Sequence, residues 1–192
     1  MLDDKILTDW NGLMIAALSK AYMAIEDKKY KDAARDAADF ILNALEKKGR
    51  LYHMYRDGEW KVYGNLDDYA FVIWGLLELY EASFEIKYLE AALKLNEDVF
   101  KYFIDDKSGG FYFTPYDNEE LLIRNKEIYD GAIPFGNSVM MLNLLRLARI
   151  TGKTEYEDSA HKLYRAFSKM LKICLWVIHF YFVQLNLLLG IV

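Results

Sequence analysis

The stretch LTDWNGLMIAAL, residues 7–18, changes from polar to strongly apolar within a few positions. Its apolar side chains recur three and four positions apart, which is the spacing of one face of an α-helix. A helix start needs only one short polar side chain as a cap. The presence of Asp9, Trp10 and Asn11 together indicates either an ordinary helix start or a binding site. The apolar stripe consists of Trp10, Leu13, Met14, Ala17, Leu18 and Ala21.

The same stripe occurs twice more, so the chain contains an internal repeat. Tyr69 lies 59 positions after Trp10, and Asn137 lies 68 positions after Tyr69. A second helical pattern follows each stripe and opens with a tyrosine, with small residues three and four positions on. Successive tyrosines of this set are 58 and 68 positions apart, and two registers that agree within one residue predict three helical hairpins. The second stripe is Tyr69, Val72, Ile73, Leu76, Leu77 and Tyr80, the third is Asn137, Met140, Met141, Leu144, Leu145 and Ala148, and the tyrosines are Tyr30, Tyr88 and Tyr156.

Short β-like segments separate the helical hairpins. Residues 51–63 contain Asp57 and Gly58, a pair typical of tight hairpin turns. Residues 109–127 offer two candidate strands on either side of a turn. Units of this kind stack side by side and can curve into a toroid of paired helices. We therefore predict an all-α fold of helical hairpin repeats over residues 1–170, with short β-hairpins between the repeats.

Composition and charge narrow the classes of function. The chain is 54% hydrophobic and 28% charged, as expected of a globular protein, and its net charge of −5 without a basic block argues against a nucleic-acid partner. The single cysteine, Cys174, excludes an internal disulfide and a CxxC redox or zinc site. The acidic N-terminal residues do not resemble a secretory signal, so we expect a cytoplasmic protein.

Residues 171–192 form an apolar tail, whose last 20 positions carry no formal charge. Twenty such residues could span a bilayer, but His179, Gln184 and Asn186 weaken that interpretation. A buried helix or strand and an altered terminus are the alternatives. A stretch this apolar is sticky when exposed, so we also expect the chain to self-associate.

Four stretches resemble the YyaL/spermatogenesis-associated protein 20 family, over residues 3 to 150. The resemblance implies an (α/α)6 toroid similar to six-hairpin glycosidases and N-acylglucosamine 2-epimerases, joined in that family to a thioredoxin-like domain. Three hairpins correspond to about half of such a toroid, and the thioredoxin-like part has no counterpart here. Phe135 also stands where the family pattern suggests a small residue. The stretches are DDKILTDWNGLMIAAL, NLDDYAFVIWGLLELYEAS, GGFYFT and RNKEIYDGAIPFGNSVMMLNLLRLA.

The repeat predicts that polar groups gather at one rim of the toroid, where its inner helices begin. Asp9, Asp68 and Gly136 occupy one position of the repeat, and the next position holds Trp10, Tyr69 and Asn137. Carboxylates in such a place could serve as general acid and base on a glycosidic bond, and aromatic rings could hold a sugar. The predicted catalytic residues are Asp68, Asp9, Asp67 and Asp130; the predicted substrate-binding residues are Trp10, Asn11, Tyr69, Tyr129, Asn137 and Ser138.

Helix capping is the alternative role for each of these acids and amides. Asp67 matches Thr8 in the repeat, so we expect Asp67 to cap its helix and Asp68 to face the pocket. Trp10 and Tyr69 are expected to belong partly to the core. No His lies at the start of an inner helix, which disfavours epimerase chemistry, although His53 could reach the pocket from a hairpin strand. We expect neither a metal nor a cofactor.

The sequence thus predicts a carbohydrate-binding or carbohydrate-processing domain, hydrolase-like through its carboxylates if it is an enzyme. The alternative is a non-catalytic interaction module that serves a thioredoxin-like domain.

Overall fold

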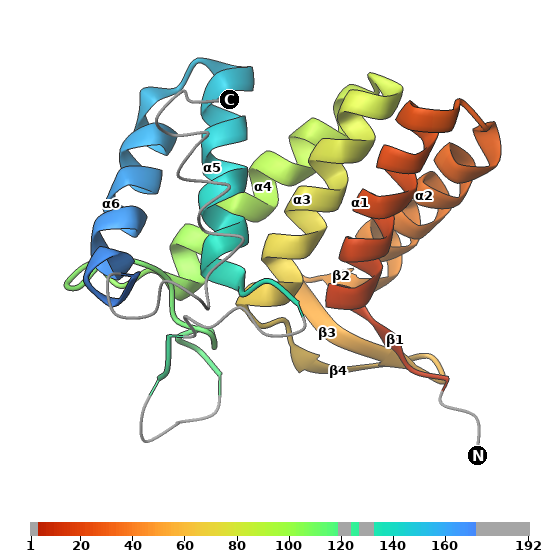
Figure 1. Ribbon diagram of the computed structural model, residues 1–192. Helices are drawn as coiled ribbons and strands as arrows, with labels where there is room; N and C mark the ends of the chain where they lie inside the picture. The colour runs from red at the N-terminus through yellow and green to blue at the C-terminus, as the bar shows by residue number, and fades with distance from the viewer. Residues whose placement is uncertain (1–3, 119–123, 127–132, 172–192) are drawn as a thin grey trace.

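A computed structural model describes residues 4–118, 124–126 and 133–171. Its helices form three antiparallel hairpins in chain order, and a small sheet lies at one end of them (Figure 1). The sheet elements are β1 (Ile6–Leu7), β2 (Glu46–Lys47), β3 (Arg50–Arg56) and β4 (Glu59–Tyr63). The helices are α1 (Thr8–Ile25), α2 (Lys28–Phe40), α3 (Leu66–Ser83), α4 (Ile86–Phe103), α5 (Gly136–Thr151) and α6 (Thr154–Leu171), with a π-helical turn, η1 (Ile41–Leu45), after α2.

The first helix of each hairpin belongs to one inner layer, in which α3 lies between α1 and α5 (Figure 1). The three inner helices begin at the same end of the molecule, beside the sheet. The predicted repeat is therefore confirmed: each of the three stripes forms an inner helix. The small residues predicted in the second helices also pack closely, since Ala34, Ala92 and Ala160 are buried.

Two glycines allow α1 and α3 to approach each other closely. A Cβ atom on Gly12 would lie 2.6 Å from the backbone carbon of Phe71, and one on Gly75 would lie 2.7 Å from the carbonyl oxygen of Gly12. Neither backbone could yield without moving a whole helix. The contact between the first two inner helices therefore requires glycine on both sides.

An ion cluster connects all three inner helices further along their length. Glu78 of α3 is buried, and its carboxylate accepts the indole N–H of Trp74 at 2.8 Å. The same carboxylate pairs with Lys20 of α1 at 3.1 Å and with Arg146 of α5 at 2.8 Å. Arg146 also reaches Glu81 at 2.7 Å. One buried acid is thus neutralised by a cation from each neighbouring helix.

The first predicted β-hairpin is present, and the described part of the second contains no strand beyond an isolated bridge. β3 and β4 pair antiparallel with Arg56 opposite Glu59, so Asp57 and Gly58 make the predicted two-residue turn. Both turn residues have positive φ, as that turn requires. In the described residues 109–118 and 124–126, Phe111 forms an isolated bridge with Ile104, and the N–H of Phe113 donates to the carbonyl of Asn125. The N–H groups of Tyr112 and Tyr116 donate to the carbonyls of Phe103 and Tyr102, at the end of α4.

The apolar tail predicted at 171–192 lies almost wholly outside the described residues. None of the helices in the described ranges combines the length and hydrophobicity that a membrane crossing would need.

Replacing Gly12 with Ala should lower the free energy of unfolding by about 1–3 kcal/mol, because the new methyl group would overlap the Phe71 backbone. Intrinsic helix propensity alone predicts the opposite sign, a gain of about 0.5–1 kcal/mol. Urea denaturation of the wild type and the variant measures the difference. The matched control is Ala17→Gly at an exposed position of α1, which should lose only the propensity term. A Gly12→Ala variant that is more stable than the wild type would contradict the close packing.

Candidate functional site

A buried carboxylate lies at the end of the inner layer where α1 and α3 begin. Asp68 is the third residue of α3 and is 1% exposed. Its Oδ2 accepts the backbone N–H of Asn65, the N-cap residue, at 2.7 Å. This bond is the returning half of a capping box, in which the third helical residue supports the residue before the helix.

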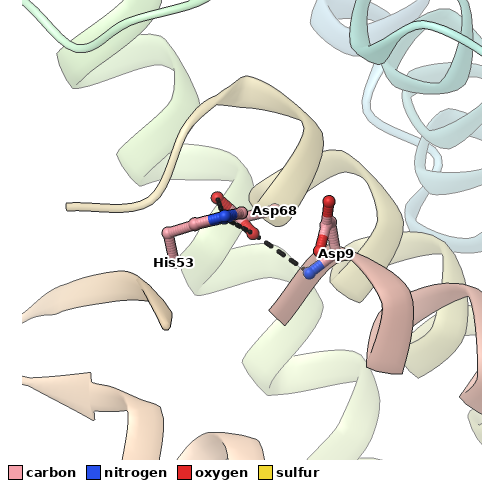
Figure 2. Close-up of side chains that lie close together, drawn as sticks. All are labelled: Asp9, His53 and Asp68. Carbon is pink, nitrogen blue, oxygen red and sulfur yellow. Dashed lines mark hydrogen bonds and ion pairs between the residues drawn. The ribbon is translucent and has the colours of Figure 1, made fainter. Parts of the chain in front are cut away.

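The same carboxylate holds two further elements in place. Oδ1 of Asp68 accepts the backbone N–H of Asp9, in the first turn of α1, at 3.0 Å. Nδ1 of His53, on β3, lies 3.0 Å from each carboxylate oxygen. Figure 2 shows His53 and Asp9 approaching Asp68 from different sides. Three segments far apart in the sequence therefore meet at one side chain.

Electrostatics couple the members of this group. The hydrogen bond to Asp68 raises the pKa of His53 above its ordinary value of 6.5, and the charges of Asp9 and Asp67 act in the same direction. Burial raises the pKa of Asp68, while the hydrogen bond to His53 opposes that change. The side chain of His53 is 28% exposed, whereas that of Asp68 is 1% exposed. The imidazole is therefore the member of this pair that solvent can reach.

The prediction that Asp67 caps α3 is wrong. α3 begins at Leu66 with Asn65 as its N-cap, so Asp67 is not the capping residue. The Asp68 side chain is buried, and its two oxygens accept N–H groups. Asp67 is only partly buried, and its Oδ1 lies beside Gly136 at the start of α5.

Three of the predicted sugar-contacting residues are structural. Tyr69 is fully buried, and its hydroxyl oxygen accepts the backbone N–H of Leu51 at 3.0 Å. The Asn137 side chain is 1% exposed and brackets Phe111, accepting its N–H and donating to its carbonyl, each at 2.9 Å. Ser138 is buried and donates to the carbonyl of Phe135 at 2.9 Å. These side chains hold neighbouring chain segments in place.

The other predicted site residues differ in their exposure to solvent. Trp10 is 57% exposed, so the expectation that it belongs partly to the core is wrong. Asn11 donates its amide to the carbonyl of Leu7 at 2.7 Å, one turn earlier. Asp9 is partly exposed, and its Oδ1 accepts the N–H of Trp10 at 2.8 Å. Tyr129 and Asp130 lie outside the described residues.

His53 is the site residue that the sequence pattern undervalued. His53 lies on β3, and the turn at Asp57 and Gly58 pairs this strand with β4, the strand that leads into α3. The hairpin turn and its position just before α3 can both be read from the sequence, and together they indicate that His53 lies near the start of this helix. Ligand atoms of Asp9, His53 and Asp68 lie within 4.8 Å of one another, a spacing that could hold a metal ion. Both Asp68 oxygens already accept N–H groups, however, so we assign no metal to this group.

The arrangement suits proton transfer or polar ligand binding at His53. A carboxylate that accepts one imidazole N–H fixes the tautomer and the orientation of the ring, and leaves the second nitrogen for another partner. Here Asp68 interacts with Nδ1, so Nε2 is the nitrogen that remains.

No family profile matches the chain. Among individual proteins, it is 36% identical over 182 residues to mouse spermatogenesis-associated protein 20 and 35% identical over 182 residues to the human protein. Each comparison covers 89% of this chain and 23% of the relative, so the chain spans about a quarter of those proteins' length. The family resemblance indicated by the four sequence stretches is thereby confirmed for this part of the relatives.

Solved structures show the same fold at low sequence identity. A GH76 α-mannanase of Bacteroides thetaiotaomicron matches with a TM-score of 0.71 at 20% identity, covering 88% of this chain and 46% of that one. Cellobiose 2-epimerase of Spirochaeta thermophila matches with a TM-score of 0.71 at 18% identity, covering 85% and 43%. An inactive variant of a Salegentibacter α-1,6-mannanase, with two consecutive aspartates replaced by asparagine and α-1,6-mannotriose bound, matches at 0.69 and 18%, covering 84% and 46%. The fold is thus that of about half of a six-hairpin toroid.

Replacing Asp68 with Asn should lower the free energy of unfolding by about 1–3 kcal/mol, since an amide cannot accept all the N–H groups that the carboxylate accepts. Chemical denaturation at neutral pH measures this loss. Asp106→Asn, at an exposed acid, is the matched control and should be nearly neutral. Equal stability of the Asp68 variant and the wild type would show that the carboxylate does not hold these segments together.

The pH dependence of the pair follows from the raised pKa of His53. Protonated imidazole is favoured in the folded state, so the stability it contributes is present below the ordinary histidine value and is lost as pH rises through the raised pKa. An NMR titration of the imidazole protons should give a lower His53 pKa in Asp68→Asn than in the wild type. The resonances of His161, on α6, serve as the internal control. An unchanged His53 titration would contradict the assigned cause.

Proposed function

Because the chain is a relative of spermatogenesis-associated protein 20, we propose that it contributes part of a toroid that binds carbohydrate at the N-terminal ends of its inner helices. The observation that carries the proposal is the meeting of Asp9, His53 and Asp68 at that end (Figure 2). Sugars are recognised by polar groups that accept and donate hydrogen bonds to their hydroxyls, and a rim of this composition supplies both.

The three residues have different roles in this proposal. Asp9 is partly exposed, and its carboxylate accepts hydrogen bonds from sugar hydroxyls. His53 offers Nε2 to the ligand, because Asp68 engages Nδ1. Asp68 is buried and acts as a positioning residue that fixes the ring. Partly buried Asp67, next to it at the start of α3, supplies a further acceptor at the same rim.

The solved structures support a carbohydrate ligand. Their names include mannanases and cellobiose 2-epimerases, and one of the mannanases holds α-1,6-mannotriose. The inactive mannanase variant lost two consecutive aspartates. This chain carries consecutive aspartates at 67 and 68, where α3 begins. The likeness in residue type supports the choice of this rim as the ligand site.

Two kinds of turnover are compatible with a sugar at this rim. Hydrolysis uses a pair of carboxylates, and Asp9 and Asp67 are less buried than Asp68 at this rim. Epimerisation removes a proton from a carbon beside a carbonyl, commonly through histidine. The His53–Asp68 pair favours this second form, since the buried acid raises the basicity of an accessible imidazole. A non-catalytic interaction module remains the alternative and predicts no sugar binding at all.

Titration of the protein with α-1,6-mannotriose and, separately, with cellobiose should detect binding of at least one of them by calorimetry. His53→Gln and Asp9→Asn should each weaken that binding about tenfold, the effect of losing one polar contact worth about 1.4 kcal/mol. Asp106→Asn, at an exposed acid outside the group of Asp9, His53 and Asp68, is the matched control.

Chromatography of the incubated sugars separates binding from turnover. Shorter products indicate hydrolysis, and an isomer of unchanged mass indicates epimerisation. If neither sugar binds, or if the two rim variants bind as tightly as the wild type, the proposal fails and the interaction module is favoured.

A further inference from the structure

Val62 of β4 occupies the position opposite His53 in the β3–β4 hairpin. The register pairs Met54 with Lys61, so the residue before Met54 stands opposite the residue after Lys61. Residues directly opposite each other on antiparallel strands place their side chains on the same face, with Cβ atoms about 4.5–5.5 Å apart. Val62 is therefore the cross-strand neighbour that the register provides for the imidazole.

Opposite side chains are in contact elsewhere in this hairpin. Tyr52 is paired with Tyr63, and their ring centroids are 5.2 Å apart. Tyr55 is paired with Trp60, and their ring centroids are 6.2 Å apart. Side chains alternate along a strand, so His53 lies on the same face as Tyr55. A valine with an ordinary extended backbone opposite His53 would lie against the imidazole in the same way.

Val62 does not have that backbone. Its φ is +61°, in the left-handed region that β-branched residues rarely adopt. A rotation of this size from the extended value turns the side chain away from the face shared with His53, and Val62 is 55% exposed. Val62 lies within a strand, so neither a turn nor a helix end accounts for its φ. The other described non-glycine residues with positive φ lie at helix ends or in hairpin turns: Glu26, Phe84, Lys48 and Asp57.

We propose that the backbone conformation of Val62 controls access to His53. In the left-handed conformation of this structure the His53 side chain is 28% exposed, and Nε2 is the nitrogen that Asp68 leaves for a ligand. In the extended conformation that β-branched residues prefer, the Val62 side chain covers the imidazole. Strained backbone positions of this kind are found at ligand sites and at segments that change between two states. The inference rests on the proposed function, since a ligand of Nε2 has to pass Val62.

The rate at which diethyl pyrocarbonate modifies His53, followed by peptide mass spectrometry, tests the proposal without a sugar. Val62→Pro fixes φ near about −65° and excludes the left-handed conformation, so His53 should react at least about fivefold more slowly than in the wild type. Val62→Gly tolerates the left-handed conformation and has no side chain to cover the ring, so His53 should react at least as fast as in the wild type. Rates are compared after correction for the unprotonated fraction of His53, which the NMR titration gives. His161, on α6, is the internal control and should react equally in all variants.

The matched control is Lys61→Pro, one position earlier on β4 and opposite Met54. Loosening of the strand can only speed the modification of His53, so a slower reaction in Val62→Pro alone reports covering of the ring. If circular dichroism shows that Val62→Pro does not fold, Val62→Phe replaces it, because the larger side chain covers more of the imidazole whenever the backbone is extended, and His53 should again react more slowly.

Two results would overturn the proposal. One is a folded variant, Val62→Pro or its replacement, in which His53 reacts as fast as in the wild type. The other is an equal slowing in Lys61→Pro. Slower modification in Val62→Pro without any sugar binding rejects the carbohydrate ligand alone. Sugar binding with unchanged modification rates rejects only the control of access by Val62.

Discussion

The carboxylate of Asp68 fixes the end of the molecule from which the inner helices start. Taking an ionised carboxylate out of water costs several kcal/mol unless hydrogen-bond donors surround it. In this protein the donors come from α1, from the residue before α3 and from β3. The N–H of Asp9 is one of the first-turn groups that has no partner within its own helix. A single buried carboxylate therefore accepts N–H groups from the starts of two helices. These N–H groups reach it only when α1 and α3 lie in one relative position.

Other residues of the inner layer either allow the helices to approach closely in that position or stabilise the contact between them. Gly12 and Gly75 remove the side chains that would hold α1 and α3 apart. Farther along, Glu78 is neutralised by Lys20 and Arg146 from the two neighbouring helices. Both buried acids of α3 thus bind groups from outside α3, so this central helix sets the position of the others. The sheet follows from the same arrangement, since His53 brings β3 to the beginning of α3.

The sequence was sufficient for the fold but not for the roles of individual polar residues. Apolar spacing identified three inner helices and their partners because periodicity reports which face of a helix is buried. The dipeptide Asp57-Gly58 identified the first β-hairpin because few residues tolerate its backbone angles. The burial of Asp68 could not be inferred, since it depends on His53 and Asp9, which lie 15 and 59 positions away. The sequence predicts Asp67 as the cap of α3, two residues after the true cap Asn65, because Asn and Asp are both residue types that cap helices well.

Equivalent positions of the repeat differ in role because their neighbours differ. Asp68 contacts the start of α1, and Gly136 in the same repeat position lies against Asp67 and Leu66 at the start of α3. This position thus faces the preceding inner helix in the second and third copies. Asp9 holds the same position in the first copy, and its carboxylate stays partly exposed. The acid of the first copy is therefore accessible to solvent, whereas the acid of the second copy, Asp68, is buried because another inner helix packs against it.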